Sequence, residues 1–415
     1  MGIWILGIYN FVSQLPNFPF LNYLVTFMFK NPFLIFFILL SIEIAVLSAA
    51  AHPRTKRYFR FLPAVFWIYF LPMLISSAGW IDSKSPLYGL VTTYGLPASL
   101  FLLLLGVDLP AIARLGRTAV LMFLFGSAGI MLGTTLSFLI FRPFVGDVFW
   151  AGFGALSASW TGGSANMIAV KEALGTPDDV FLPMVVVDTI VPYIWMGLLV
   201  TASTGQVAFD RWLRADRGVI DDIRQRMSNV GQKQIATLNV KNIVLLAGFA
   251  FVVSAALQRV AQVLPTAEGI ISSFAWTIIL VSTAGLAGSL TPLRRCEAMG
   301  STKIGYYLLY FVLTTIGARA SVSHLGASAI LIAAGAVIIL VHAAVLLTAA
   351  RLLKAPMMLA AAASQANVGG VASAPVVAEI YQPGLAPIGL LMAILGNIIG
   401  TYLGIVVGQI CRWLA

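Results

Sequence analysis

Charged residues are scarce in this sequence of 415 residues. Only 10% are Asp, Glu, Lys or Arg, whereas 60% are hydrophobic and the mean hydropathy is +0.96. A water-soluble protein could not cover its surface with so few charges. The composition therefore excludes a soluble globular domain. It predicts an all-α polytopic membrane protein, because long apolar runs cross a bilayer as helices.

Cysteine and histidine are also rare. The two cysteines, Cys296 and Cys411, indicate no disulfide framework, and the three histidines form no Cys/His cluster that would bind a metal. We therefore expect no metal and no cofactor beyond a coupling ion. The net charge is +10. In a membrane protein, Lys and Arg in the cytoplasmic loops usually produce such a charge, so it does not indicate nucleic-acid binding.

Apolar runs follow one another along the chain, and most approach the ~20 residues that a membrane-spanning helix needs. With a short helix expected at 19–30, the sequence predicts 12 or 13 helical segments. The runs lie at 32–50, 62–80, 87–107, 118–141, 149–173, 180–203, 240–263, 269–290, 303–319, 326–350, 355–380 and 385–411.

One long polar segment, 206–238, separates the first six runs from the last six. Its mixed charges predict an amphipathic linker helix on the membrane surface. The N-terminal stretch has no basic region before its apolar residues, so we interpret it as an interfacial segment and not as a cleaved signal peptide. The predicted organisation is an N-terminal segment 1–31, a first repeat 32–203, a polar linker 204–239 and a second repeat 240–411.

The two halves resemble each other when the second is shifted by 207 residues, which places Gly162-Gly163 on Gly369-Gly370. Basic residues gather at 51–60 in the first half, but at 292–303 and 351–354 in the second, at the opposite ends of matching segments. The positive-inside rule then predicts inverted repeats, as in many secondary transporters. Six crossings per half would instead give parallel repeats, so either a crossing is miscounted or one run is re-entrant.

Two stretches combine a Gly-Gly pair with hydroxyl and amide side chains inside apolar runs. Each Gly weakens a helix by roughly 1 kcal/mol relative to Ala, and a broken helix frees backbone groups that water, an ion or a substrate can satisfy. Close helix packing is the alternative explanation. The predicted substrate-binding residues are Ser157, Thr161, Gly162, Gly163, Ser164, Asn166, Gln365, Asn367, Gly369 and Gly370.

Ionisable residues inside apolar runs are costly and mark candidate ion sites. Asp188 lies deep in the run VVVDTIVPYIW and is predicted to bind Na⁺ or carry a proton. His342 and His324 are expected to be packing residues. The predicted cation-binding residues are Asp188, Asn166, Gln365 and Asn397.

The segments SASWTGGSAN, VVVDTIVPYIW and SQANVGGVASAPVVAE resemble the YjcL-like family of uncharacterised bacterial membrane proteins. That family is similar to cation:proton antiporters and to bile-acid:sodium and glutamate:sodium symporters. The resemblance implies an inverted repeat with two broken helices, 149–173 and 355–380, that cross near the membrane middle. It also implies a core that slides against a scaffold in an elevator mechanism, a homodimer, and a place in the bacterial cytoplasmic (inner) membrane.

Secondary active transport is the function that these features favour: a Na⁺- or H⁺-coupled symporter of a small organic anion, amino acid or peptide. A cation/proton antiporter is the alternative, although the adjacent acids Asp178-Asp179 and Asp221-Asp222 lie in predicted loops. A remote alternative is an intramembrane serine hydrolase, since Ser164 lies in GGSAN, near a nucleophile-elbow pattern. We expect no enzymatic activity, because Asn166 stands where the nucleophile-elbow pattern ends in glycine.

Overall fold

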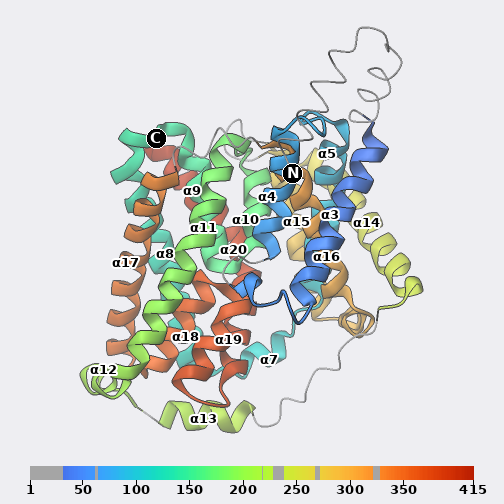
Figure 1. Ribbon diagram of the computed structural model, residues 1–415. Helices are drawn as coiled ribbons and strands as arrows, with labels where there is room; N and C mark the ends of the chain where they lie inside the picture. Colours follow the sequence, from blue (N-terminus) through green and yellow to red (C-terminus); the bar gives the residue numbers. More distant parts are fainter. Residues whose placement is uncertain (1–30, 61–63, 217, 228–237, 267–271, 321–327) are drawn as a thin grey trace, which may run out of the picture.

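The computed structural model describes residues 31–60, 64–216, 218–227, 238–266, 272–320 and 328–415, and these form helices with no strand (Figure 1). Within them, seven helices are long and apolar enough to cross a membrane, or eight if a bent pair counts as one span. The prediction of an all-α polytopic membrane protein is confirmed. The predicted interfacial segment and the short helix at 19–30 fall almost wholly outside the described residues.

The first half of the chain forms six helical units and a short connector. Two units are interrupted: a π-helical turn (Val91–Gly95) joins α5 to α6, and a single glycine separates α9 from α10. The helices are α3 (Pro32–Ala51), α4 (Ala64–Ser77), α5 (Pro86–Leu90), α6 (Leu96–Leu105), the connector α7 (Leu109–Ala113), α8 (Gly116–Val145), α9 (Trp150–Gly162), α10 (Ser164–Ala173) and α11 (Asp178–Ala202).

The second half repeats this order of helices. α9 and α18 begin at Trp150 and Met357, which are 207 positions apart, as are Gly163 and Gly370 at the two breaks. The helices are α14 (Val240–Val263), α15 (Ser273–Ser289), a 3-10 segment (Pro292–Met299), α16 (Ser301–Arg319), α17 (Ser328–Leu352), α18 (Met357–Val368), α19 (Gly370–Tyr381) and α20 (Ala386–Leu414).

Equivalent helices of the two halves run in opposite directions. A Cβ added to Gly129 of α8 would meet His342 of α17, whereas one added to Gly133, a turn later, would meet Ile338, a turn earlier. α8 and α17 are therefore antiparallel neighbours. Since these two helices occupy matching places in the halves, the halves are inverted copies of each other.

The interrupted units α9–α10 and α18–α19 are hairpins. The Thr176 hydroxyl, just beyond α10, donates to the carbonyl of Ala151 in the first turn of α9 at 3.3 Å, so the chain leaves on the side where it entered. In the second unit, Gln365 Nε2 donates to Ser373 Oγ at 2.8 Å. A continuous helix would separate these residues by about 12 Å. Hairpin 1 (150–173) lies in the upper part of Figure 1 and hairpin 2 (357–381) in the lower part.

The segments 149–173 and 355–380 are broken helices, as the resemblance implies. At each break the chain turns back on itself. Besides its hairpin, each half has five helical units among the described residues, an odd number. This re-entrant arrangement removes the conflict between six runs per half and inverted repeats.

The helices pack as two groups. The hairpin bundle contains α8 to α11 and α17 to α20, and the outer bundle contains α3 to α6 and α14 to α16. The closest packing occurs within each group, between α9 and α20 and between α8 and α17 in one, and between α6 and α16 in the other. In Figure 1 the hairpin bundle lies mainly on the left and the outer bundle on the right.

Glycines let hairpin 1 approach α20 closely. A Cβ added to Gly400 would lie 2.9 Å from the Cα of Gly162, and one added to Gly404 would overlap Ala158. Small residues at every fourth position are typical of tight helix contacts in membranes. The Gly-rich face of α20 thus fixes hairpin 1 within the hairpin bundle.

The polar segment after α11 forms two helices at the lower edge of Figure 1, α12 (Gln206–Leu213) and α13 (Gly218–Met227). Asp210 of α12 accepts a hydrogen bond from the backbone N–H of Met357, the first residue of α18, at 2.8 Å. A carboxylate at this position satisfies a helix N-terminus. The first part of the predicted linker is therefore attached to hairpin 2.

Candidate functional site

The two hairpin tips contain the special backbone geometry of the site. Gly163 has φ +86° and Gly370 has φ +63°, conformations that residues with a Cβ rarely adopt. α10 begins directly after Gly163, and α19 begins at Gly370. Both helices therefore direct their N-terminal ends, which carry a partial positive charge, toward the middle of the molecule.

A cavity of about 210 Å³ lies between the tips. Hairpin 1, hairpin 2, α11 and α20 form one wall, and α4 and α16 of the outer bundle form the other. The polar residues of the first wall are Ser159, Ser164, Asp188, Thr189, Tyr193, Gln365, Ser373 and Asn397. The outer bundle contributes Val65, Phe66, Tyr306, Leu309, Tyr310 and Leu313.

All four predicted glycines and several predicted side chains meet at this cavity. Its lining includes six of the ten residues assigned to substrate: Gly162, Gly163, Ser164, Gln365, Gly369 and Gly370. Three of the four residues assigned to a cation also line it: Asp188, Gln365 and Asn397. The structure thus brings together residues that are about 200 positions apart in the chain.

Among the described residues, Asp188 is the only carboxylate that lines the cavity. It comes from the middle of α11, between Pro183 and Pro192, and lies beside the side chains of Ser159 and Trp160. No basic side chain among the described residues lines the cavity. Asp188 is therefore suited to attract a cation.

Gln365 presents an unused acceptor to the cavity. Its Nε2 donates to Ser373 Oγ, but its Oε1 is buried and has no hydrogen-bond partner among the described residues. Leaving a buried acceptor without a donor costs about 1–3 kcal/mol. A bound group with an N–H, an O–H or a positive charge would satisfy it.

Asn166 lies behind the tip of hairpin 1. Its Nδ2 donates to the carbonyl of Gly162 at 2.7 Å, and its Oδ1 accepts from the hydroxyl of Thr401 at 2.5 Å. Both ends of the amide are thus occupied. Asn166 lines a second cavity of about 210 Å³, which extends toward Asp108 and Glu297 and shares Asn397 with the first.

Three predicted substrate residues do not line either cavity. Ser157 and Thr161 are buried in α9, where the Thr161 hydroxyl donates to the Ser157 carbonyl. Asn367 Oδ1 accepts from the hydroxyl of Ser127 at 2.8 Å, and its Nδ2 donates to the Ala363 carbonyl at 2.9 Å. These side chains support the hairpins from behind.

His342 is part of a buried polar network in the hairpin bundle. Its Nδ1 lies 2.9 Å from the Gly126 carbonyl and its Nε2 lies 2.9 Å from Ser364 Oγ, which accepts from the indole of Trp195. Because a carbonyl only accepts, Nδ1 carries the proton, and Nε2 accepts from Ser364. His324 lies outside the described residues.

The outer wall and four polar residues of the first wall, Ser159, Thr189, Tyr193 and Ser373, were not predicted from the sequence. Tyr306 and Tyr310 are one helical turn apart in α16, which is a weak signal for a shared face. All four polar residues of the first wall lie within the quoted motifs but were not assigned to the site. Only the packing of α4 and α16 against the hairpin tips reveals the apolar wall.

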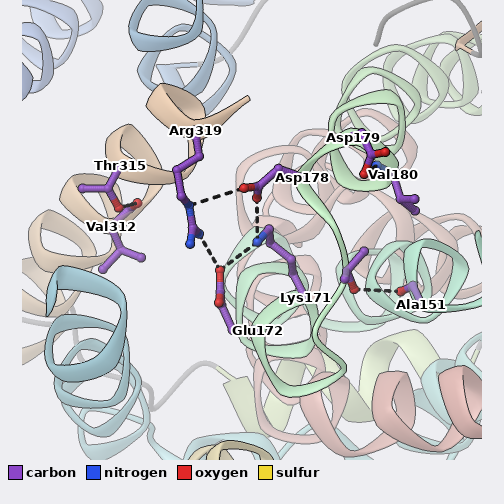
Figure 2. A network of polar contacts seen from close by, with 10 residues as sticks. Ala151, Lys171, Glu172, Asp178, Asp179, Val180, Val312, Thr315 and Arg319 are labelled. Atoms are coloured by element: carbon purple, nitrogen blue, oxygen red, sulfur yellow. Dashed lines mark hydrogen bonds and ion pairs between the residues drawn. The ribbon is translucent and has the colours of Figure 1, made fainter. Parts of the chain in front are cut away.

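Four charged residues form a network at the upper end of hairpin 1 (Figure 2). Arg319, at the end of α16, lies 2.9 Å from Glu172 Oε1 and 3.5 Å from Asp178 Oδ2. Lys171 lies 2.8 Å from Glu172 and 2.9 Å from Asp178, and its side chain is almost fully buried. The network joins the outer bundle to the base of hairpin 1 and to the start of α11.

The known proteins that this chain resembles agree with a membrane architecture, but their descriptions name no substrate or reaction. Residues 38–414 match a family described as "Protein of unknown function (DUF819)". The chain is similar to the "Uncharacterized membrane protein YjcL" of Bacillus subtilis (strain 168), with 26% identity over 353 residues. That alignment covers 81% of this chain and 87% of the relative.

Proposed function

This chain belongs to the DUF819 family of proteins of unknown function, and from that premise we propose that it is a secondary active transporter. In this proposal it is a symporter that moves a small organic anion, amino acid or peptide together with Na⁺ or H⁺. The cavity between the hairpin tips is the binding site. Asp188 provides the negative charge at which a cation binds.

The observation that carries the proposal is the meeting of two re-entrant hairpins from opposite sides at one polar cavity. Broken or re-entrant backbone at membrane depth is tolerated where it lines a cavity. Helix ends there recognise ions and charged solutes in transporters. Close packing alone explains the glycines that face α20, but it does not explain why the buried Gln365 oxygen, which has no partner among the described residues, lines the same cavity as a carboxylate.

Alternating access follows from the two bundles. The hairpin bundle forms the polar wall of the cavity, and the outer bundle forms a mainly apolar wall. In the proposed elevator mechanism, the hairpin bundle slides along the outer bundle. The cavity then opens to each side in turn. The ion pairs of Arg319 with Glu172 and Asp178 join the bundles, so this movement requires them to separate.

The experiment is gradient-driven uptake by the purified full-length protein in liposomes, with a broad panel of labelled solutes. We expect accumulation of a solute when a Na⁺ or H⁺ gradient is imposed, and no accumulation when an ionophore dissipates it. Absence of gradient-driven uptake across the panel would contradict the proposal. Localisation in the bacterial cytoplasmic membrane and assembly as a homodimer are parts of the same proposal.

A cation/proton antiporter is the second candidate, because Asp188 lies in the cavity and exchanges a proton for a cation in such a mechanism. It predicts a pH change inside vesicles when Na⁺ or K⁺ is added without any organic solute. For the serine hydrolase, the base would have to be near Ser164. His342 instead contacts Ser364 and the Gly126 carbonyl, so we propose no enzymatic role.

A further inference from the structure

The two walls of the cavity differ in chemistry, and this difference narrows the proposed function, on which the inference rests. The hairpin bundle contributes hydroxyls, amides and Asp188. The outer bundle contributes aliphatic and aromatic side chains, including Phe66, Leu309 and Leu313. A solute that fits both walls has a polar head toward the hairpin tips and an apolar tail toward α4 and α16.

The fixed charges of the cavity limit the charge of the head group. α10 and α19 are 10 and 12 residues long, and each N-terminus carries roughly half a positive charge. Together they balance about one carboxylate. A dicarboxylate would bring a second negative charge next to Asp188, and no lysine, arginine or histidine of the described chain lines the cavity to offset it.

Asp188 requires a positive charge of its own when the cavity is dehydrated around a solute. A carboxylate left unpaired in a low-dielectric site is strongly unfavourable. The buried Oε1 of Gln365, which is without a partner among the described residues, likewise calls for a donor or a cation. The ligand set as a whole therefore contains one negative and one positive charge.

The size of the cavity limits the tail. Its volume of about 210 Å³ is smaller than the ~300–1,000 Å³ of pockets that bind drug-sized ligands. A solute of the size of a free amino acid fits this space, whereas a peptide of several residues does not.

We infer that the cavity binds a small monocarboxylate with a short apolar tail, together with one positive charge at Asp188. The carboxylate lies at the N-termini of α10 and α19, and the tail lies against α16. The positive charge is either the ammonium group of the same molecule, as in an aliphatic α-amino acid, or a separate Na⁺ ion.

The test measures thermal stability of the purified full-length protein with four probes, each in NaCl and in choline chloride. The probes are L-leucine, 4-methylpentanoate, 3-methylbutylamine and succinate. Ligands that bind the folded state raise Tm with concentration. We expect a rise with L-leucine in both salts if the ammonium occupies Asp188. If Na⁺ occupies it, we expect a rise with 4-methylpentanoate in NaCl alone. Succinate and 3-methylbutylamine should leave Tm unchanged.

Variants connect the signal to the cavity. Asp188→Asn should abolish the ligand-induced rise in Tm, and Gln365→Leu should require a higher ligand concentration for the same rise. Asp179→Asn, the same change at an exposed position of the same helix, should behave as the wild type. Only variants whose Tm without ligand matches that of the wild type are compared. If neither cavity variant meets this condition, Leu313→Phe provides the test. It places a bulkier side chain in the wall that contacts the apolar tail, and it should reduce the ligand-induced rise in Tm.

The inference is overturned if succinate or 3-methylbutylamine stabilises the protein as well as the monocarboxylates do. It is also overturned if neither monocarboxylate raises Tm. These outcomes differ from failure of the proposed function. Gradient-driven uptake of succinate would leave transport intact and refute the solute class, whereas leucine binding without uptake would retain the site and refute transport.

Discussion

The guanidinium of Arg319 lies 2.9 Å from the carboxylate of Glu172, and this contact bridges the outer bundle and hairpin 1 (Figure 2). The two side chains are 25% and 15% exposed, so the pair is largely shielded from water. Ion pairs of this kind are stronger than fully exposed ones, because less solvent screens them.

A double-mutant cycle of Arg319→Gln and Glu172→Gln tests this contact. We expect a coupling energy of about 1–2 kcal/mol in reversible unfolding in detergent. The ion pair of Arg142 with Asp147, whose side chains are 34% and 64% exposed, is the control and should show a smaller coupling. Equal coupling in both pairs would show that the contact between the bundles has no special strength.

Neutralising Asp188 should abolish coupled transport. Asp188→Asn removes the carboxylate that the described residues bring to the cavity while keeping its shape, so we expect cation-dependent uptake to fall at least about tenfold, equivalent to about 1.4 kcal/mol. The measurement is initial uptake in liposomes containing equal amounts of folded protein. Asp179→Asn serves as the matched control. Undiminished uptake by Asp188→Asn would place the cation elsewhere.

Tight packing of α20 against α9 should be sensitive to one methyl group. In Gly404→Ala the new Cβ would overlap Ala158, and overpacking of this kind costs about 1–3 kcal/mol of stability. Gly248→Ala, in α14, is the control, because a Cβ there meets nothing within 4 Å. We expect a lower Tm for the first variant and an unchanged or slightly higher one for the second. The reverse order would contradict the close helix contact.

Substitutions at Gly370 test the left-handed backbone conformation at the tip of hairpin 2, because an added Cβ meets no steric obstacle there. Its φ is +63°, and nothing lies within 4 Å of an added Cβ, so Gly370→Ala should cost only the left-handed conformation, about 1–2 kcal/mol. Gly370→Asn should cost less, because Asn adopts this conformation more readily than Ala. Comparison of their unfolding free energies checks this order. Equal stability of the three proteins would mean that the tip adopts another conformation.

Much of the architecture was readable from the sequence, because it depends on composition and on spacing. Scarce charge predicted membrane helices, and the shift that superposes Gly163 on Gly370 matches the order of helices in both halves. The hairpins were left undecided. A Gly-Gly break indicates that a helix ends, but the direction of the following helix depends on contacts such as that of Thr176 with Ala151.

The candidate site was predicted only in part, for a related reason. Polar residues near a break are recognisable in sequence, but their orientation is not. Asn367 and Thr161 lie in the predicted stretches, yet they turn away from the cavity and support the hairpins. The apolar wall from α4 and α16 carries no sequence signal, because its residues are ordinary for a membrane helix.

Of the four residues in the charged network at the base of hairpin 1, only Glu172 has a matching charged residue in the other half of the chain, Glu379. At the positions 207 residues away, Lys171 is matched by Ala378, Asp178 by Leu385 and Arg319 by Ile112. In the proposed cycle, closure of the side at the base of hairpin 1 is therefore stabilised by ion pairs that the matching positions of the other half do not provide. Salt weakens these ion pairs. The balance between the two end states, and with it the resting orientation of the protein, would then vary with ionic strength.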